Sequence, residues 1–210
     1  MIEFECSCAM GKHRAPLEGY EISAGALKKI PEILKDYNKI YVVADENTYR
    51  AAGKQVEEIL KDMTLEEKVG QMTQITATAI ANGLDITPAG DSIIRTYKIG
   101  SVLNTPGDIA QDPAGYDRFI TELNRISMEE MGIPTLYGLD HIHGTTYVLG
   151  GTLFPQEINI AASFNRDHAY NMGKVTAYES RAANVPWTFS PTMDLGRNPE
   201  WPRMWESFGE

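Results

Sequence analysis

Hydrophobic positions follow a helical spacing most clearly between Pro113 and Gly132. A proline suits the first turn of a helix and a glycine its C-terminal cap, so the helix should span 113–131. Its inner face would carry six apolar side chains, namely Tyr116, Phe119, Ile120, Leu123, Ile126 and Met131. We expect this helix to cover one face of the core.

Short apolar runs separate the helical segments and predict strands. Residues 99–104, 133–139 and 187–191 are too short for core helices and are bounded by Gly or Pro. Strands that alternate with helices indicate a parallel sheet with right-handed crossovers. The fold class predicted for the later part of the chain is therefore α/β.

Two further helices carry recognisable start signals. Thr64 and Glu67 have the spacing of a capping box, which predicts a helix to about Met72 with Leu65, Val69 and Met72 facing inward. Asn165 can cap a helix that runs to about residue 183. We expect the inner face of that second helix to be made of three small residues, Ala169, Gly173 and Ala177. Residues 83–90 are predicted to be loop, and 158–162 a turn before a strand.

The first 62 residues predict a separate, Rossmann-like α/β segment. A helix from Ser23 to Leu34 precedes a strand over 39–45, and a helix carrying Val56 and Ile59 follows. The turn after the strand is acidic, whereas a dinucleotide site needs a glycine-rich turn there. The pattern thus favours a packed layer without a nucleotide.

Composition also changes near residue 62. Residues 1–62 contain seven of the ten lysines, while all three tryptophans lie later. We therefore predict two domains, 1–62 and 63–210, in a chain that is chimeric or truncated. The net charge of −10 argues against nucleic acid and anionic membranes as partners, since both require clustered basic residues.

Cysteine content and hydropathy suggest a cytoplasmic protein. Cys6 and Cys8 do not make a disulfide framework, and neither a signal peptide nor a membrane span is visible. Two thiolates near His13 fall short of a four-ligand zinc site. We expect no metal and no cofactor.

Candidate chemistry gathers in two stretches. The 133–139 strand ends in Asp140-His-Ile-His143-Gly, and parallel sheets deliver site residues at such carboxyl ends. The second stretch, 190–210, combines acids, guanidinium groups and tryptophans in a way that suits sugar binding. His141 and His143 could suggest a metal, but further ligands are hard to assemble, so hydrogen bonding of His143 to backbone or carboxylate is favoured.

Several of these segments resemble glycoside hydrolase family 3 β-glucosidases. The matching motifs are Met63-Thr-Leu-Glu-Glu-Lys-Val-Gly-Gln-Met-Thr-Gln74, Lys98–Asn104, Ile133–Gly144, Thr152-Leu-Phe-Pro-Gln, Glu179-Ser-Arg181 and Phe189–Glu210. The resemblance implies the first half of a (β/α)₈ barrel that acts on β-glucosides. Its open strand edges would favour self-association.

The resemblance also implies site residues. Asp140 and Arg203 match the aspartate and arginine that bind sugar hydroxyls in the −1 subsite, and Pro202 replaces the glycine that commonly precedes this arginine. His143, Asp194, Arg197, Trp201 and Glu206 are candidates for a supporting layer, in which Asp194 and Arg197 brace the loop. Trp201 or Trp205 could offer a flat face to the ring, although packing is their expected use.

No catalytic residue is assigned within the chain. In the resembled family the nucleophile and the acid/base follow this segment, so the chain alone is expected to be weak or inactive. A non-catalytic sugar-binding or split-barrel module is the alternative. Residues 1–62 resemble the N-terminus of glycerol-1-phosphate dehydrogenases of the iron-type alcohol dehydrogenases, through Cys6-Ser-Cys8 and 41–53. A polyol-phosphate dehydrogenase fragment is therefore a second alternative.

Overall fold

A computed structural model describes residues 2–5, 12–15 and 54–209, which divide between two compact units, Met1–Lys61 and Asp62–Glu210. In the first unit β1 (Ile2–Glu5) and β2 (Lys12–Ala15) pair as an antiparallel hairpin that we did not predict. Helix α3 (Lys54–Asp62) agrees with the last helix predicted for this segment. The helix predicted from residue 23 and the strand over 39–45 lie outside the described residues.

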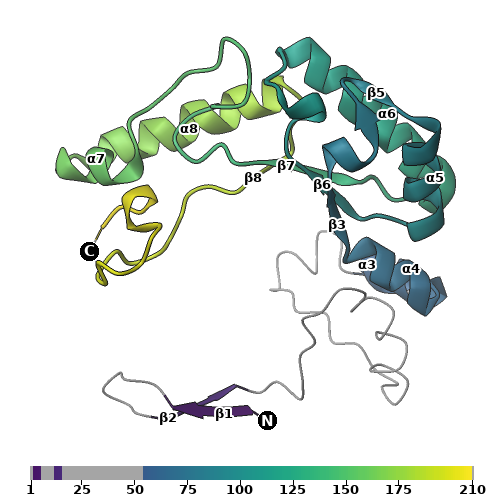
Figure 1. Ribbon diagram of the computed structural model, residues 1–210, viewed down its shortest axis with the longest axis horizontal. Helices are drawn as coiled ribbons and strands as arrows, with labels where there is room; N and C mark the ends of the chain where they lie inside the picture. Colours follow the sequence, from purple (N-terminus) through teal and green to yellow (C-terminus); the bar gives the residue numbers. More distant parts are fainter. Residues whose placement is uncertain (1, 6–11, 16–53, 210) are drawn as a thin grey trace. The chain divides into compact units, whose positions relative to one another are not determined.

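The second unit is built on a four-stranded parallel sheet (Figure 1). Its order is β3 (Gln74–Thr76), β6 (Ser101–Leu103), β7 (Leu136–Leu139) and β8 (Trp187–Thr188). In the register of the sheet Val102 pairs with Tyr137, and Gly138 with Trp187. The parallel α/β architecture predicted from the alternation of strands and helices is therefore confirmed.

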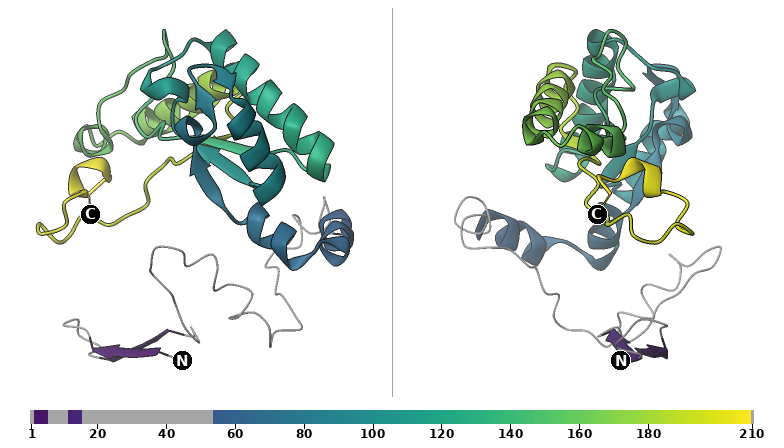
Figure 2. Two further views of the ribbon diagram at one scale, coloured as in Figure 1. Left: turned by 45° about the vertical axis from the view of Figure 1, so that its right-hand side comes forward. Right: turned by 90° about the vertical axis from the view of Figure 1, so that its left-hand side faces the viewer.

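Five helices belong to the described part of this unit. They are α4 (Leu65–Gln71), α5 (Pro88–Tyr97), α6 (Pro113–Met131), α7 (Glu157–Ala162) and α8 (Arg166–Ala182). Short elements complete it, namely η3 (Ala77–Ala79), β4 (Ala81–Asn82), β5 (Asp85–Ile86), η4 (Pro106–Asp108) and η5 (Met204–Glu206). Helices α5 and α6 lie side by side, and α7 lies against both α8 and η5 (Figures 1 and 2).

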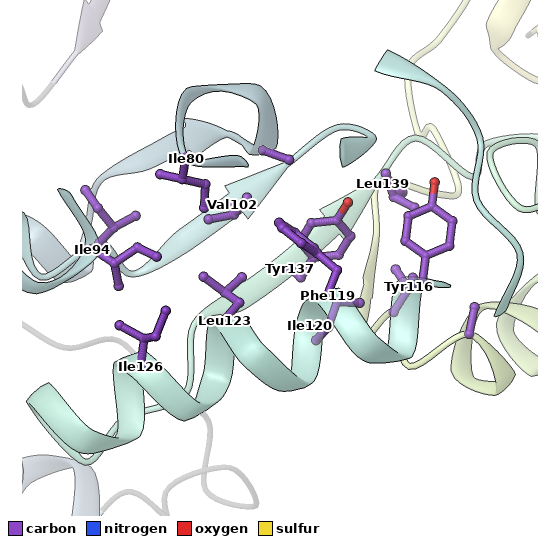
Figure 3. Packing of buried hydrophobic residues seen from close by; sticks show 14 of the residues in the cluster. Ile80, Ile94, Val102, Tyr116, Phe119, Ile120, Leu123, Ile126, Tyr137 and Leu139 are labelled. Atoms are coloured by element: carbon purple, nitrogen blue, oxygen red, sulfur yellow. The ribbon is translucent and has the colours of Figure 1, made fainter. Parts of the chain in front are cut away.

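The core lies between α6 and the sheet (Figure 3). Phe119 of α6 meets Tyr137 of β7 edge to face, with ring centroids 5.8 Å apart. All but one of the side chains predicted for the inner face of α6 are buried, namely Tyr116, Phe119, Ile120, Leu123 and Ile126. Gly132 caps the helix in the left-handed conformation (φ 67°), as predicted, because glycine adopts it without strain.

Helix α4 begins with the predicted capping box. The Thr64 hydroxyl accepts from the Glu67 amide, and the Glu67 carboxylate accepts from the Thr64 amide. The inward placement of Met72 was wrong, because its side chain is 71% exposed at the C-cap. The residue that the helix buries is Gly70, which packs against the backbone of Tyr97.

The predicted inner face of α8 was also wrong. Gly173 and Ala177 are exposed, and the buried residues are Met172, Thr176 and Ser180. The small residues share one helix face, but small size alone does not specify which face meets the sheet. Among the described residues, no helix combines the length and apolar character required to cross a membrane.

Two segments predicted as loop or turn are more regular than expected. Residues 83–90 contain β5 and the start of α5, which is capped by the Thr87 hydroxyl. Residues 158–162 are helical and belong to α7. Strand β5 and helix α7 are short, and tertiary contacts stabilise such short elements more than their own sequence does.

Candidate functional site

Strand β7 brings Asp140 to the carboxyl end of the sheet. Its last three residues are buried, and Leu139 is followed directly by Asp140, which is half-buried. The Phe189 amide donates to the Leu139 carbonyl at 3.2 Å, so the pairing with the chain after β8 continues to this point. Because neighbouring strands are parallel, their carboxyl ends meet at the same edge.

A hollow of about 530 Å³ opens beside Asp140, and we call it the Asp140 hollow. The residues of its lining that matter here are Asp140, His143, Tyr147, Gln156, Arg203, Trp205 and Glu206. They come from the end of β7, the loop that follows it, the residue before α7, and the η5 segment. The structure therefore brings together Asp140 and Arg203, which are far apart in the chain.

Arg203 is held by a bidentate pair with Glu206. Its Nε and Nη2 both donate to the Glu206 carboxylate, the latter at 2.9 Å. The two side chains differ in burial, since Glu206 is 4% exposed whereas the Arg203 side chain is 64% exposed. The hydrogen bond to Glu206 is the main reason why the pKa of Arg203 is raised. Such fork geometry fixes the plane of the guanidinium group.

The Asp140 carboxyl experiences opposing electrostatic effects within this lining. Burial raises its pKa, the positive charge of Arg203 lowers it, and the negative charge of Glu206 raises it, with a net upward shift. When ionised, the Asp140 carboxylate can accept hydrogen bonds through both of its oxygens.

His141, the residue after Asp140, is anchored in the core next to the hollow. It is completely buried, its Nδ1 lies 2.8 Å from the Ser180 hydroxyl of α8, and its ring stacks on Tyr147 with centroids 6.2 Å apart. Burial lowers the pKa of His141 to about 4, against a smaller opposing effect of Glu179. His141 is therefore neutral at physiological pH and packs in the core behind Asp140.

His143 behaves as predicted, since its Nδ1 donates to the Phe154 carbonyl at 2.8 Å. This hydrogen bond ties the chain after β7 to the segment that leads into α7. Within the described ranges no three His, Cys, Asp or Glu side chains cluster in a way that could hold a metal ion.

Other candidates lie outside the lining of the Asp140 hollow. Asp194 and Arg197 are exposed in the loop before η5, and Trp201 is half-buried. Asp194 still contributes to the field around Arg203, whose pKa its charge raises slightly. The loop is closed by the Gly196 amide, which donates to the Gly209 carbonyl at 3.1 Å.

Tyr147 and Gln156 were not predicted as part of the site. Tyr147 is 40% exposed although its ring rests on His141, and the buried side-chain oxygen of Gln156 has no hydrogen-bond partner. Trp205, 51% exposed, also faces the hollow instead of being packed away. No local pattern marks Tyr147 or Gln156, because each depends on a loop that folds back toward β7.

The lining suits a small polyhydroxylated ring. Asp140 can accept hydrogen bonds from two hydroxyls, and Arg203 can donate from the part of its guanidinium that Glu206 does not engage. Tyr147 and Trp205 add apolar surface, which the C–H faces of a sugar ring can contact.

Comparisons with known proteins agree with this chemistry. Residues 64–210 match the family described as the glycosyl hydrolase family 3 N-terminal domain. A lysosomal beta glucosidase of Dictyostelium discoideum is 36% identical over 167 residues, covering 74% of this chain and 20% of the relative. A periplasmic beta-glucosidase of Salmonella typhimurium is 32% identical over 156 residues, covering 74% of this chain and 18% of the relative.

Solved structures show the same likeness. The beta-glucosidase from Listeria innocua in complex with isofagomine superposes with a TM-score of 0.55 at 29% identity, covering 75% of this chain and 20% of that one. The same enzyme in complex with glucose gives a TM-score of 0.55 at 28% identity, over 75% and 21%. The chain thus spans about a fifth of the length of the curated relatives it matches.

Proposed function

The chain belongs to glycosyl hydrolase family 3, and from this premise we propose that it forms the glucose-binding part of a β-glucosidase-type glycoside hydrolase. The observation that supports the proposal most directly is that Asp140 and Arg203 line one hollow. Its volume of about 530 Å³ is of the size that small-ligand sites have. The reaction proposed for the whole enzyme is hydrolysis of the O-glycosyl bond of a β-glucoside.

Asp140 and Arg203 would share the recognition of the sugar hydroxyls. The carboxylate accepts from two hydroxyls, and the guanidinium, fixed by Glu206, donates to a neighbouring one. Each charge-assisted hydrogen bond of this kind is worth about 1.5–3 kcal/mol. His143 and Glu206 act as supports, and Trp205 and Tyr147 offer apolar faces.

Bond cleavage would depend on carboxylates other than these. Retaining glycosidases use two carboxyl groups about 5–5.5 Å apart, one as nucleophile and one as acid/base. Among the described residues that line the Asp140 hollow, the acids are Asp140 and Glu206. The Glu206 carboxylate is already engaged by hydrogen bonds from Arg203. We therefore assign no nucleophile to this chain and expect it, by itself, to bind sugar with little or no turnover.

The sheet supports a further part of the proposal, that the unit is the first half of a (β/α)₈ barrel. Strands β3 and β8 are the outer strands of the described sheet. In a barrel both edges would pair with further strands, and in their absence they would pair with another chain. Sedimentation velocity tests this point, because edge pairing predicts association that rises with concentration, whereas a monomer throughout would count against it.

Glucose titration followed by amide NMR tests the binding role. We expect shifts at Asp140, His143 and Arg203, and a loss of affinity of at least about tenfold in Asp140→Asn, the size of one charge-assisted hydrogen bond. Asp194→Asn is the matched control, because Asp194 lies in the same region but outside the lining. An Asp140→Asn protein that binds glucose as tightly as the control would overturn the assignment.

Turnover assays separate the proposal from a chain that is itself catalytic and from the dehydrogenase alternative. Release of p-nitrophenol from its β-glucoside, abolished by Asp140→Asn, would mean that the chain carries catalytic groups after all. Glucose binding without turnover is the expected result, and it equally fits a sugar-binding module that is not part of an enzyme. NAD-dependent oxidation of a glycerol phosphate would instead support the dehydrogenase alternative.

A further inference from the structure

A buried carboxyl group next to the Asp140 hollow has no hydrogen-bond partner on any other residue. Glu157, the first residue of α7, is 0% exposed, and neither of its carboxyl oxygens has a hydrogen-bond partner. The residue before it, Gln156, lines the hollow. An ionised carboxylate buried without a partner is strongly unfavourable, so its charge must be neutralised in some way.

The charged groups around Glu157 come from each element packed against α7. Helix α7 packs on η5, which carries Glu206, and on α8, whose first charged residues, Arg166, Asp167 and His168, are all exposed. The loop after β7 contributes His143. Burial raises the pKa of Glu157. Its own backbone amide and the nearby His143 lower it in part, and Glu206 raises it further, so the net shift is upward.

Protonation is the way of neutralising the Glu157 carboxyl that fits its surroundings. Among the described residues, no lysine or arginine side chain bonds to Glu157 or contributes to the shift of its pKa. In the described part of the chain no group of three His, Cys, Asp or Glu residues could hold a metal ion there. A carboxyl group in an apolar site can stay protonated at neutral pH, and enzymes use such groups as neutral acids.

We propose that Glu157 is kept as a neutral carboxylic acid and acts as a positioning residue, which leaves the charge of Glu206 committed to Arg203. The functional part of this statement rests on the proposed glucose-binding role of Arg203. With Glu157 neutral, Glu206 and Arg203 form a balanced pair in the wall of the hollow. A second negative charge in α7 would repel the Glu206 carboxylate, and through it would disturb the guanidinium plane of Arg203.

NMR titration of the full chain tests the charge state without any sugar. We expect the ¹³C signal of the Glu157 carboxyl to titrate well above that of Glu200, an exposed glutamate in the loop before η5. The Arg203 Nε–H signal should shift with the same midpoint as Glu157. Titration of Glu157 together with Glu200 would overturn the proposal, and this measurement needs no variant that might fail to fold.

Glu157→Gln tests the link to Arg203. Asp140 also titrates beside Arg203, so the comparison is made in an Asp140→Asn background. Glutamine keeps the shape of the neutral acid, so in that background Glu157→Gln should make the Arg203 signal independent of pH over the Glu157 midpoint, whereas Glu200→Gln should leave the shift unchanged. If Arg203 still shifts in the Asp140→Asn, Glu157→Gln protein, Glu157 is not its positioning residue. Glucose affinity should fall above the midpoint in the wild type alone. If glucose does not bind at all, the binding role fails while the two titrations still decide the state of Glu157.

Discussion

His141 and Ser180 join two distant parts of the fold, with Nδ1 and Oγ 2.8 Å apart across 39 residues of chain. His141 follows Asp140 directly, and Ser180 lies on the buried face of α8. The backbone that carries Asp140 is therefore anchored on a helix as well as on the sheet.

We predict that His141 makes the protein less stable in mild acid. Its pKa is about 4 in the fold, where burial lowers it, and about 6.5 in an unfolded chain. Between these values the unfolded state takes up a proton that the folded state does not. Stability therefore falls as pH decreases from about 6.5 to about 4, by up to about 3 kcal/mol, and changes no further below that range.

Urea denaturation at pH 7, 5.5 and 4.5 measures this effect. His141→Gln can still bond to Ser180 but does not titrate, so its stability should depend less on pH than that of the wild type. His168→Gln is the control, because His168 is exposed. Equal pH dependence in the wild type and His141→Gln would show that another group is responsible.

Truncation of the core at Leu123 should be strongly destabilising. Leu123 of α6 is completely buried, and Figure 3 shows it between the helix and the sheet. Leu123→Ala should lower the free energy of unfolding by about 2–5 kcal/mol, because it removes apolar contacts and leaves a cavity. Met128→Ala on the same helix is the control, as that side chain is 48% exposed. Similar losses for both variants would contradict the packing described here.

Two helical glycines should respond oppositely to alanine. A Cβ on Gly90 would lie 1.9 Å from the Ile80 carbonyl oxygen, so Gly90→Ala should cost about 1–3 kcal/mol as α5 is pushed away. A Cβ on Gly173 would meet nothing within 4 Å, and alanine there should add about 0.5–1 kcal/mol of stability. Thermal melting of the two variants checks the signs, and a destabilised Gly173→Ala would mean that the face is covered.

The Glu179 carboxylate should stabilise the conformation of the loop between Gly144 and Leu153. Its carboxylate accepts from the Thr145 hydroxyl at 2.9 Å and from the Thr152 amide and hydroxyl at 2.8 and 2.6 Å. Burial raises the pKa of Glu179, but the Thr152 and Thr145 hydrogen bonds outweigh it, and the net shift is downward. Glu179→Ala should speed hydrogen exchange at the Thr152 amide by at least about tenfold, equivalent to ~1.4 kcal/mol.

The comparison for this prediction is the Gly132 amide, which is bonded to the Met128 carbonyl at the end of α6. It should exchange at the same rate in the wild type and in Glu179→Ala. A general increase at both amides would indicate global destabilisation instead of a loosened loop.

Elements with strong local signals were predictable. The capping box at Thr64 and Glu67 satisfies its amides within four residues, and α6 carries an unambiguous apolar face with a glycine cap. The predicted strands 133–139 and 187–191 contain β7 and β8, although both observed strands are shorter. The motif around Asp140 was specific enough to indicate the family.

Elements without such local signals could not be predicted from the sequence. The hairpin of β4 and β5, the helix α7 and the exposed side of α8 depend on which surfaces meet in space. In α8 both Ala169-Gly173-Ala177 and Met172-Thr176-Ser180 follow helical spacing. Only the packing of the second set, with Ser180 against His141, decides between them.

The sequence by itself determined helices α4, α6 and α8, the parallel sheet and the membership in glycosyl hydrolase family 3, because caps, periodicity and motifs act over a few residues. The tertiary structure alone decided that Asp140 and Arg203 share a hollow, that Glu206 holds Arg203, and that Glu157 is buried without a partner. These relations arise where the end of β7, the start of α7 and η5 converge, and burial and electrostatics depend on that convergence rather than on neighbours in the chain.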